Sequence, residues 1–557
     1  MDERITFDGV QKILHPGGLT NLVQAVVDGG DHRYGRSLWN TIAALSFVPE
    51  RLAGESAQIV AARMSQLAIL VTAFVLLSTT FVRRWALRFL LVASLLAMPY
   101  TDYYMSMPKP EPLQMLALAG FLYLFRKHSL ALGRSYWLLL GFAFGTKISV
   151  LPVLALCLLM ATLRERPLAR PDEYVAKLAA AVGYCLIGLA VAVPILIPNV
   201  AAAVTGFALA AKWWNQESSV RKWPSSIAIG GALLAATFAV EVLCVRSGIR
   251  TPIAAWAHST FLNTAHGADS SAVGFTAWVG YFFVEWLDAP TVLIAALAAV
   301  VLVLAGCEFW GTVRARMNGV PVAAGSLFLL IGGLALNCSI FLNAHRLWGM
   351  YLFPGTTLLL VGVLSLFDEA LPEGRSNWHG RTNGKIPFEG TLARVGLLVV
   401  TAVTFAWWLP HSLVRYESLA HRTASANYAD EHSSFVKVLR FLDTHSKDRD
   451  RRLEVSIDPD LFLPQNTERY RITEFWGPFA QWDRTPDVIV FGPGHTERAK
   501  APPSGSPNQG DYLLERDGYS RYVIGKNQKC LLASCYVREE MLPNGGEILV
   551  LVRPGRS

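Results

Sequence analysis

The stretch AQIVAARMSQLAILVTAFVLLSTTFV, residues 57–82, decides the fold class. It is longer than the roughly 20 apolar residues that one membrane-spanning helix needs. Further apolar runs follow it along the chain, among them 176–198, 226–245, 290–310, 321–341, 347–367 and 392–410. The 557 residues are 52% hydrophobic and only 17% charged, which is too apolar for a soluble protein of this length. We therefore predict a polytopic α-helical membrane protein.

Basic residues gather in the short loops between these apolar runs. The clusters are Arg83, Arg84 and Arg88; Arg126, Lys127 and Arg134; Arg164, Arg166 and Arg170; and Arg314 and Arg316. The net charge of +8 is therefore a topology signal, and it does not indicate a nucleic-acid partner. By the positive-inside bias these loops are cytoplasmic, and the loops between them face outward.

The order of the runs predicts three regions. Because the run 57–82 ends at Arg83, it travels inward, and residues 1–56 form a first outer loop with an amphipathic helix and an acidic motif. Shorter runs at 85–98, 111–126, 136–147 and 149–163, with two crossings in 176–214, complete a membrane domain over 57–410 with about twelve spans. An even number of spans places residues 411–557 outside as well.

The tail lacks any long apolar run and reads as a small α/β soluble domain. A helical pattern covers 433–445, and strand-like runs cover Leu453–Ile457, Val488–Phe491, Tyr522–Ile524 and Ile548–Val552.

Polar residues that could carry chemistry fall on the predicted outer side, at helix ends or in short loops. They are Asp2, Glu3, Asp102, Lys109, Glu111, Lys147, His345 and Arg346. A single polar residue at a membrane interface is more often a solvated or snorkelling group than a functional one. Lys147 differs because it lies in an apolar stretch, where an ammonium group needs an anionic partner.

Taken in order, these motifs resemble the GT-C superfamily of polyprenyl-phosphate-sugar glycosyltransferases, especially protein O-mannosyltransferases and lipid A aminoarabinose transferases. The matching motifs are the acidic pair Asp2-Glu3, the proline-bounded loop 99–112, the Gly145-Thr146-Lys147 turn and the stretch His345 to Pro354. Members of this family have one more membrane helix before the acidic loop. We hypothesise that the start codon is misplaced or that this first helix is lost.

The resemblance implies an inverting single displacement on the outer face of the membrane, and it assigns roles to the residues. Asp2 is the candidate general base, with Glu3 as its rival. Asp102 and Glu111 would orient the acceptor or hold a divalent cation, since paired carboxylates suit Mg²⁺ or Mn²⁺; metal dependence is left open. The donor phosphate would be bound by Lys109, Lys147, His345 and Arg346.

The partners implied are a polyprenyl-phosphate sugar donor, a lipid, glycan or protein acceptor, and membrane lipids. The implied location is a bacterial inner membrane, with the catalytic face and the C-terminal domain in the periplasm. Two alternatives stay open. A secondary transporter would place its ionisable residues near the midplane on broken helices, and a polymerase or ligase would act on other lipid-linked glycans.

Overall fold

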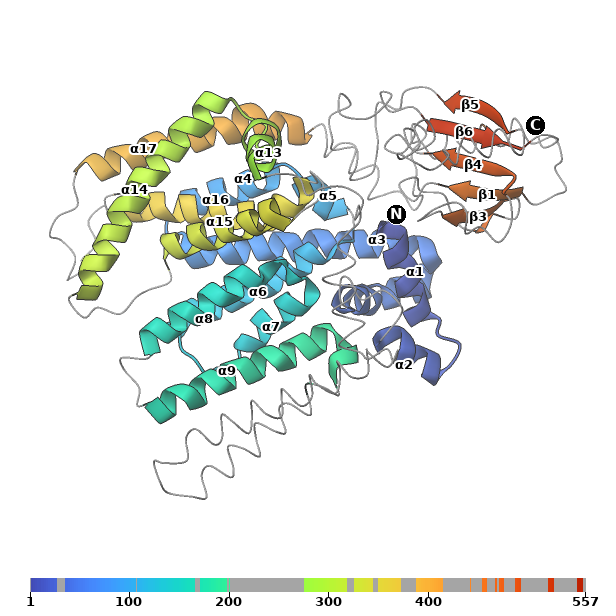
Figure 1. Cartoon of the computed structure of the whole chain (residues 1–557), viewed down its shortest axis with the longest axis horizontal. Coiled ribbons are helices and arrows are strands. Elements are labelled where there is room, and N and C mark those ends of the chain that lie inside the picture. The colour runs from blue at the N-terminus through green and yellow to red at the C-terminus, as the bar shows by residue number, and fades with distance from the viewer. Residues whose placement is uncertain are drawn as a thin grey trace, which may run out of the picture. The chain divides into compact units, whose positions relative to one another are not determined.

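A computed structural model of the chain (Figure 1) describes part of the molecule. The described residues are 2–27, 36–106, 108–165, 171–197, 200, 275–317, 325–343, 349–371, 387–413, 441, 453–457, 466–467, 470–474, 486–491, 519–524 and 548–553. The chain divides into two compact units. One is helical and comprises Thr6–Gly54 and Ala61–Tyr416; the other contains the sheet and comprises Met1–Ile5, Glu55–Val60 and Glu417–Ser557.

Helices account for most of the described residues. In chain order they are α1 (Asp2–Leu14), α2 (Leu19–Val27), α3 (Ser37–Phe81), α4 (Trp85–Ala97), α5 (Thr101–Ser106), α6 (Pro110–Lys127), α7 (Trp137–Thr146), η1 (Ile148–Val150), α8 (Leu151–Glu165), α9 (Pro171–Ala192), η2 (Pro194–Leu196), α13 (Phe275–Gly280), η5 (Tyr281–Trp286), α14 (Thr291–Met317), α15 (Ser326–Asn343), η6 (Gly349–Leu352), α16 (Phe353–Ala370), α17 (Pro387–Ala402) and η7 (Val403–Trp408).

Within the described part, five helical segments are long and apolar enough to cross a membrane. They are Ala57–Phe81, Ile148–Glu165, Thr291–Arg314, Phe353–Ala370 and Glu389–Leu413. These segments and the small sheet are compatible with the predicted helical membrane protein. The number of about twelve spans stays a prediction, because the predicted run 226–245 and much of 176–214 lie outside the described residues.

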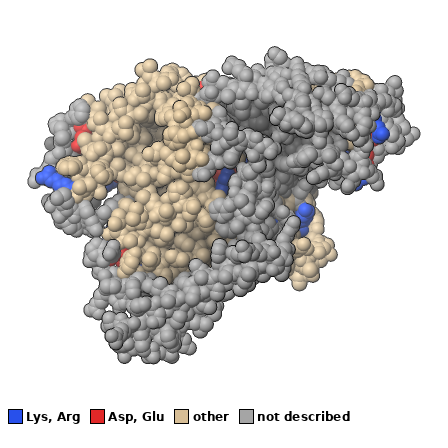
Figure 2. Space-filling view, in the orientation of Figure 1, with Lys and Arg blue, Asp and Glu red and all other residues tan. Residues whose placement is uncertain are grey.

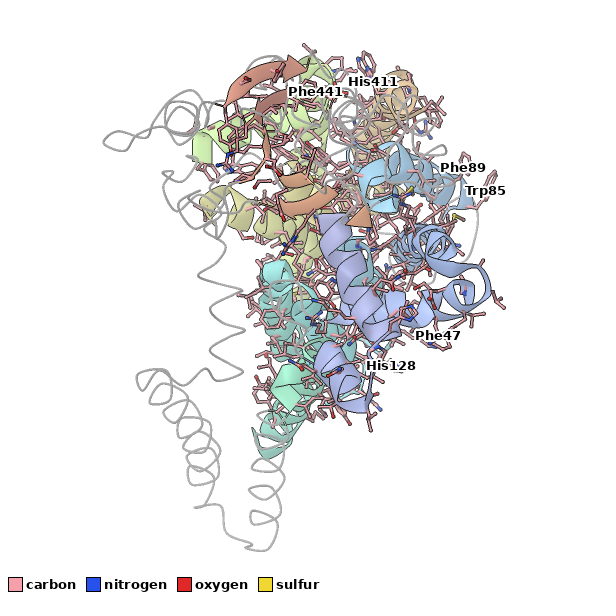
Figure 3. All side chains as sticks on the ribbon, turned by 90° about the vertical axis from the view of Figure 1, so that its right-hand side faces the viewer. Phe47, Trp85, Phe89, His128, His411 and Phe441 are labelled. Carbon is pink, nitrogen blue, oxygen red and sulfur yellow. The ribbon has the colours of Figure 1, made fainter. Side chains whose placement is uncertain are left out.

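The surface of the helical unit suits a lipid environment. Figure 2 shows few Lys, Arg, Asp or Glu side chains over the described helices that face the viewer. Trp85 and Phe89, one turn apart on α4, are 81% and 69% exposed and point away from the bundle (Figure 3). Trp85 directly follows the basic pair Arg83 and Arg84, and a tryptophan beside basic residues is typical of a membrane interface.

The α3 helix changes direction at Gly54. Its φ of 78° lies in the left-handed region that favours glycine, and an added Cβ would meet no atom within 4 Å. The glycine is therefore needed for its backbone conformation and not for space. The bend separates residues 37–53 from the spanning part of α3, in the region where the sequence predicts an outer segment with an amphipathic helix.

Helices α7 and α9 approach each other closely through glycines. A Cβ at Gly141 would lie 1.9 Å from the carbonyl oxygen of Cys185, and one at Gly188 would lie 2.0 Å from that of Leu138. Only glycine permits such backbone contact, as in other membrane helix pairs that pack through small residues. This contact fixes α7, whose last residue Thr146 precedes Lys147.

Polar contacts join several helix ends at one end of the bundle. Arg84 pairs with Asp368 of α16 at 2.7 Å, and Arg126 of α6 donates to the carbonyl oxygen of Thr80 in α3 at 2.7 Å. Ser326 of α15 donates to Glu369 at 2.9 Å. The basic residues of two predicted cytoplasmic loops thus lie at the same end, as a shared side of the membrane requires.

The described strands of the tail form one mixed sheet. They are β1 (Leu453–Ile457), β2 (Asn466–Thr467), β3 (Tyr470–Glu474), β4 (Val488–Phe491), β5 (Ser520–Ile524) and β6 (Ile548–Val552), in the order β2-β3-β1-β4-β6-β5. Strand β1 runs parallel to β3 and β4, and the other pairs are antiparallel. Strands β4 and β6 are buried along their whole length, so the core of the sheet lies there.

Four of these strands confirm the sequence prediction, with β5 beginning two residues earlier than predicted. The sequence analysis missed β2 and β3. Of the helix predicted at 433–445, only Phe441 is described; its ring lies 5.0 Å from that of Tyr522.

Candidate functional site

Three of the residues predicted to carry chemistry lie together in the helical unit. The Nζ atom of Lys147 forms an ion pair with Oε1 of Glu111. The Lys147 side chain is 16% exposed and that of Glu111 only 3%. Lys109 is 4% exposed, and it is close enough for its charge to interact with both of them. The structure therefore joins Lys147 to an anionic partner, as its place in an apolar stretch predicts.

Prolines set the position of Lys109 and Glu111. Pro110 is the first residue of α6, where its fixed φ suits a helix start and its missing N–H is not needed. The residue before a proline is driven to an extended conformation, and Lys109 has φ −130° and ψ 153°. Glu111 lies in the first turn of α6, where the helix dipole favours a negative charge.

Lys147 lies at a break between two helices. Its backbone is extended, with φ −158° and ψ 129°, between the end of α7 and the start of η1. Such a break leaves backbone groups that must be satisfied inside a membrane bundle. Gln114 of α6 donates to the carbonyl oxygens of Ala143, at 3.2 Å, and of Lys147. The Gln114 side chain therefore holds the break in place beside Glu111.

Three other described residues contact the lysines of the cluster. Gln66 of α3 donates to the carbonyl oxygen of Lys109 at 2.8 Å. The ammonium groups of Lys109 and Lys147 lie 5.8 Å and 5.2 Å from the ring centroids of Tyr103 and Tyr351, within the range of a cation–π interaction. Each of the two lysines thus lies beside an aromatic ring, and the two rings come from distant parts of the sequence.

The charges of the cluster favour an anion. Two ammonium groups share one carboxylate, so the fully protonated cluster carries an excess positive charge. Burial lowers the pKa of Lys109 to about 7; the Glu111 carboxylate opposes this change and the Lys147 ammonium adds to it. A negatively charged ligand beside Lys109 would favour its protonated form. The cluster is therefore suited to bind an anion at or below neutral pH.

Tyr104 adds a neutral donor to the cluster. Burial, and after it the negative charge of Glu111, raises the pKa of its hydroxyl well above the ordinary value. The ring of Tyr104 packs 4.5 Å from that of Phe353 at the start of α16. The hydroxyl consequently stays protonated at physiological pH beside the Glu111 carboxylate.

The cluster lies far from the basic end of the bundle. Gln66, which holds Lys109, precedes Thr80, which Arg126 contacts, by about 14 residues of α3, or about 21 Å at 1.5 Å per residue. The cluster and the contacts of Arg84 and Arg126 thus lie at different ends of the helical unit.

The structure brings only part of the predicted site together. Asp102 is buried in α5, with 4% of its surface exposed. Asp2 and Glu3 begin α1, but their side chains lie outside the described residues, as do His345 and Arg346 entirely. Their roles stay predictions.

Sequence reasoning missed two arginines that are among the largest fully buried side chains described. Arg63 lies inside the spanning part of α3, three residues before Gln66 and so on the same face of the helix. Arg36 stacks on Trp39 at 3.9 Å, and the following residue, Ser37, is hydrogen-bonded to Thr146 beside Lys147 at 3.0 Å. A signal for Arg63 was present, since an arginine within an apolar span is a functional hypothesis by default.

No metal centre is found among the described residues, where no three His, Cys, Asp or Glu side chains are grouped as ligands. Lys147 pairs with Glu111, one of the two carboxylates that the sequence analysis considers for a divalent cation.

No protein-family model matches the sequence, and the comparison with curated proteins finds no match. The resemblance to the GT-C superfamily therefore rests on the order of the motifs in the sequence.

Proposed function

We propose that this protein is a membrane glycosyltransferase that transfers a sugar from a polyprenyl-phosphate donor to an acceptor hydroxyl. The observation that carries the proposal is the buried cluster of Lys109, Glu111 and Lys147, in which Lys147 forms an ion pair with Glu111 and Lys109 lies close enough to interact with both. Cations held in a water-poor site are what the departing phosphate of such a donor needs. The outer face of a bacterial inner membrane is the proposed place of reaction.

The proposed reaction is a single displacement at the anomeric carbon. Asp2, or Glu3 in its place, takes the proton of the acceptor hydroxyl as the oxygen of that hydroxyl forms the new bond to carbon. The bond between this carbon and the phosphate oxygen breaks, and the electron pair leaves with the polyprenyl phosphate. Lys109 and Lys147 offset the charge that develops on the phosphate, together with His345 and Arg346.

The depth of the cluster supports a transferase over a transporter. A transporter needs its binding site near the midplane, so that it can open to either side. The cluster instead lies about 21 Å along α3 from the basic end. This one-sided position suits a site that receives a lipid-linked donor laterally from one leaflet.

The first test is a donor screen on the purified protein in lipid nanodiscs. A panel of polyprenyl-phosphate sugars is supplied with candidate acceptors, and the release of polyprenyl phosphate is measured. We expect release with one donor class. Asp368→Asn, which alters a buried ion pair at the opposite end, is the control; it should lower stability, and the protein that stays folded should remain active. Transport of a donor or sugar across a liposome membrane without any release would refute the proposal.

The second test addresses the general base. Asp2→Asn keeps the size and hydrogen-bonding capacity of the side chain but removes its basic lone pair. We expect turnover to fall by roughly 10²- to 10⁴-fold while donor affinity is retained. Glu3→Gln should have a smaller effect. If both variants keep full turnover and Asp102→Asn loses it, the base belongs to the second outer loop.

A further inference from the structure

We propose that Glu111 is a counter-ion that the donor displaces: Lys147 exchanges the Glu111 carboxylate for the donor phosphate, and Lys109, which already interacts with Glu111, remains beside it to balance its charge. This inference rests on the proposed function and extends it. It changes the role of Glu111 from an acceptor or metal ligand to a residue that positions Lys147 before the donor arrives.

The two members of the ion pair differ in their freedom to move. Glu111 is 3% exposed and belongs to the first turn of α6, which Pro110 begins and Pro112 stiffens. Lys147 carries its ammonium on a flexible four-carbon chain, and its side chain is 16% exposed. The exchange therefore moves the lysine, while the carboxylate stays where it is.

Glu111 and Lys147 each have other contacts that can stabilise their charges after the exchange. Glu111 keeps the positive end of α6 and the ammonium of Lys109, two residues before it. Lys147 lies over the ring of Tyr351, which supports the cation without competing as an anion. Two ammonium groups then balance one carboxylate and one phosphodiester, and no net charge is left buried.

The alternative arrangement, with Glu111 and the phosphate both bound to Lys147, places two negative charges side by side. Like charges brought together in a desolvated site repel each other strongly. An ammonium has three donors and could reach both groups, but this repulsion favours the exchange. Glu111 consequently competes with the donor for Lys147.

The test measures binding, not turnover, with a short-chain prenyl phosphodiester as the probe. Its single negative charge is constant over the pH range used. The wild type and Glu111→Gln are compared at a pH about one unit below the pKa of Lys109, which is about 7, so that the lysines are protonated. If Glu111 competes for Lys147, Glu111→Gln should bind the probe at least about tenfold tighter.

Controls separate this effect from a general change in the protein. Asp368→Asn removes a buried carboxylate from the Arg84 ion pair at the other end and should leave the affinity unchanged. The prenyl alcohol without phosphate should bind the wild type and Glu111→Gln equally. Glu111→Asp shortens the side chain by one methylene and should increase the affinity for the probe by less than Glu111→Gln does. If Glu111→Gln does not fold, the affinity of Glu111→Asp tests the exchange instead.

Each outcome has a defined meaning. Tighter binding by Glu111→Gln, or by Glu111→Asp, supports the exchange, because a merely structural residue would not oppose the ligand. Unchanged or weaker binding in a folded variant overturns the exchange and leaves the proposed function standing. If the wild type binds no prenyl phosphodiester at all, the proposed function fails and the exchange fails with it.

Discussion

Lys147 and Glu111 depend on each other because both lie largely out of water. Removing one partner of a buried ion pair leaves an uncompensated charge and typically costs about 3–5 kcal/mol, whereas replacing both partners is often neutral. Because of this difference, single and double substitutions can distinguish the contribution of the ion pair to stability from the contribution of Lys147 to ligand binding.

We therefore expect Lys147→Met to lower both thermal stability and donor affinity. The double variant Lys147→Met with Glu111→Gln should recover most of the stability, because no unpaired charge is left, but should not recover the affinity. Thermal unfolding and probe binding measure the two effects in the same preparations. If the double variant binds the donor as the wild type does, Lys147 is not part of the phosphate site.

The sequence predicts part of this cluster. An ammonium in an apolar stretch requires an anion, so a partner for Lys147 was expected, but its identity was not. Glu111 is 36 positions away, and it becomes the partner only because α6 packs against α7. Spacing along the chain carries no information on such packing, and for this reason Glu111 was assigned to the acceptor or a metal. Arg36 was missed for a similar reason, since its burial depends on tertiary structure.

At the scale of the elements, the glycine contact between α7 and α9 controls where Lys147 lies. Added volume at this contact must separate the two helices, because the nearest atoms belong to backbone. The end of α7 would then move relative to α6 and Glu111. A displacement of about 1 Å can reduce a rate by about two orders of magnitude.

Gly188→Ala should therefore reduce turnover by at least about tenfold and lower thermal stability. Gly183→Ala, on the same helix, is the matched control, because an added Cβ there meets nothing within 4 Å. The control should behave as the wild type, with a slight gain in stability from the better helix former. Equal effects of the two substitutions would mean that helix propensity, and not the close contact, determines the result.

Elements with a strong local pattern were predicted well. The chain breaks between α7 and η1 at Lys147, which is the last residue of the predicted Gly145-Thr146-Lys147 turn. Strands β1, β4 and β6 have the predicted bounds. Strands β2 and β3 were missed because Asn466–Thr467 is too short, and Tyr470–Glu474 too polar, to give a hydrophobic pattern. Their pairing with β1 is a tertiary effect that a local pattern does not contain.

At the scale of the whole molecule, the basic loops after α3 and α6 share one end of the bundle. If this end is cytoplasmic, the predicted span count places the tail in the periplasm. A reporter enzyme that is active only in the periplasm should be active when fused after Ser557. The same reporter inserted between α6 and α7 should be inactive. Activity in the loop, or its absence at the tail, would reverse the assignment of sides.

The ion pair between Arg84 and Asp368 joins residues that are 284 positions apart. A ribosome adds about 5–20 residues per second, so about 14–57 s separate the synthesis of Arg84 from that of Asp368. During this interval the early helices are already made, but their partner on α16 does not yet exist. A nascent chain that stalls before Asp368 therefore leaves Arg84 without this carboxylate, and the early helices lack this link to α16.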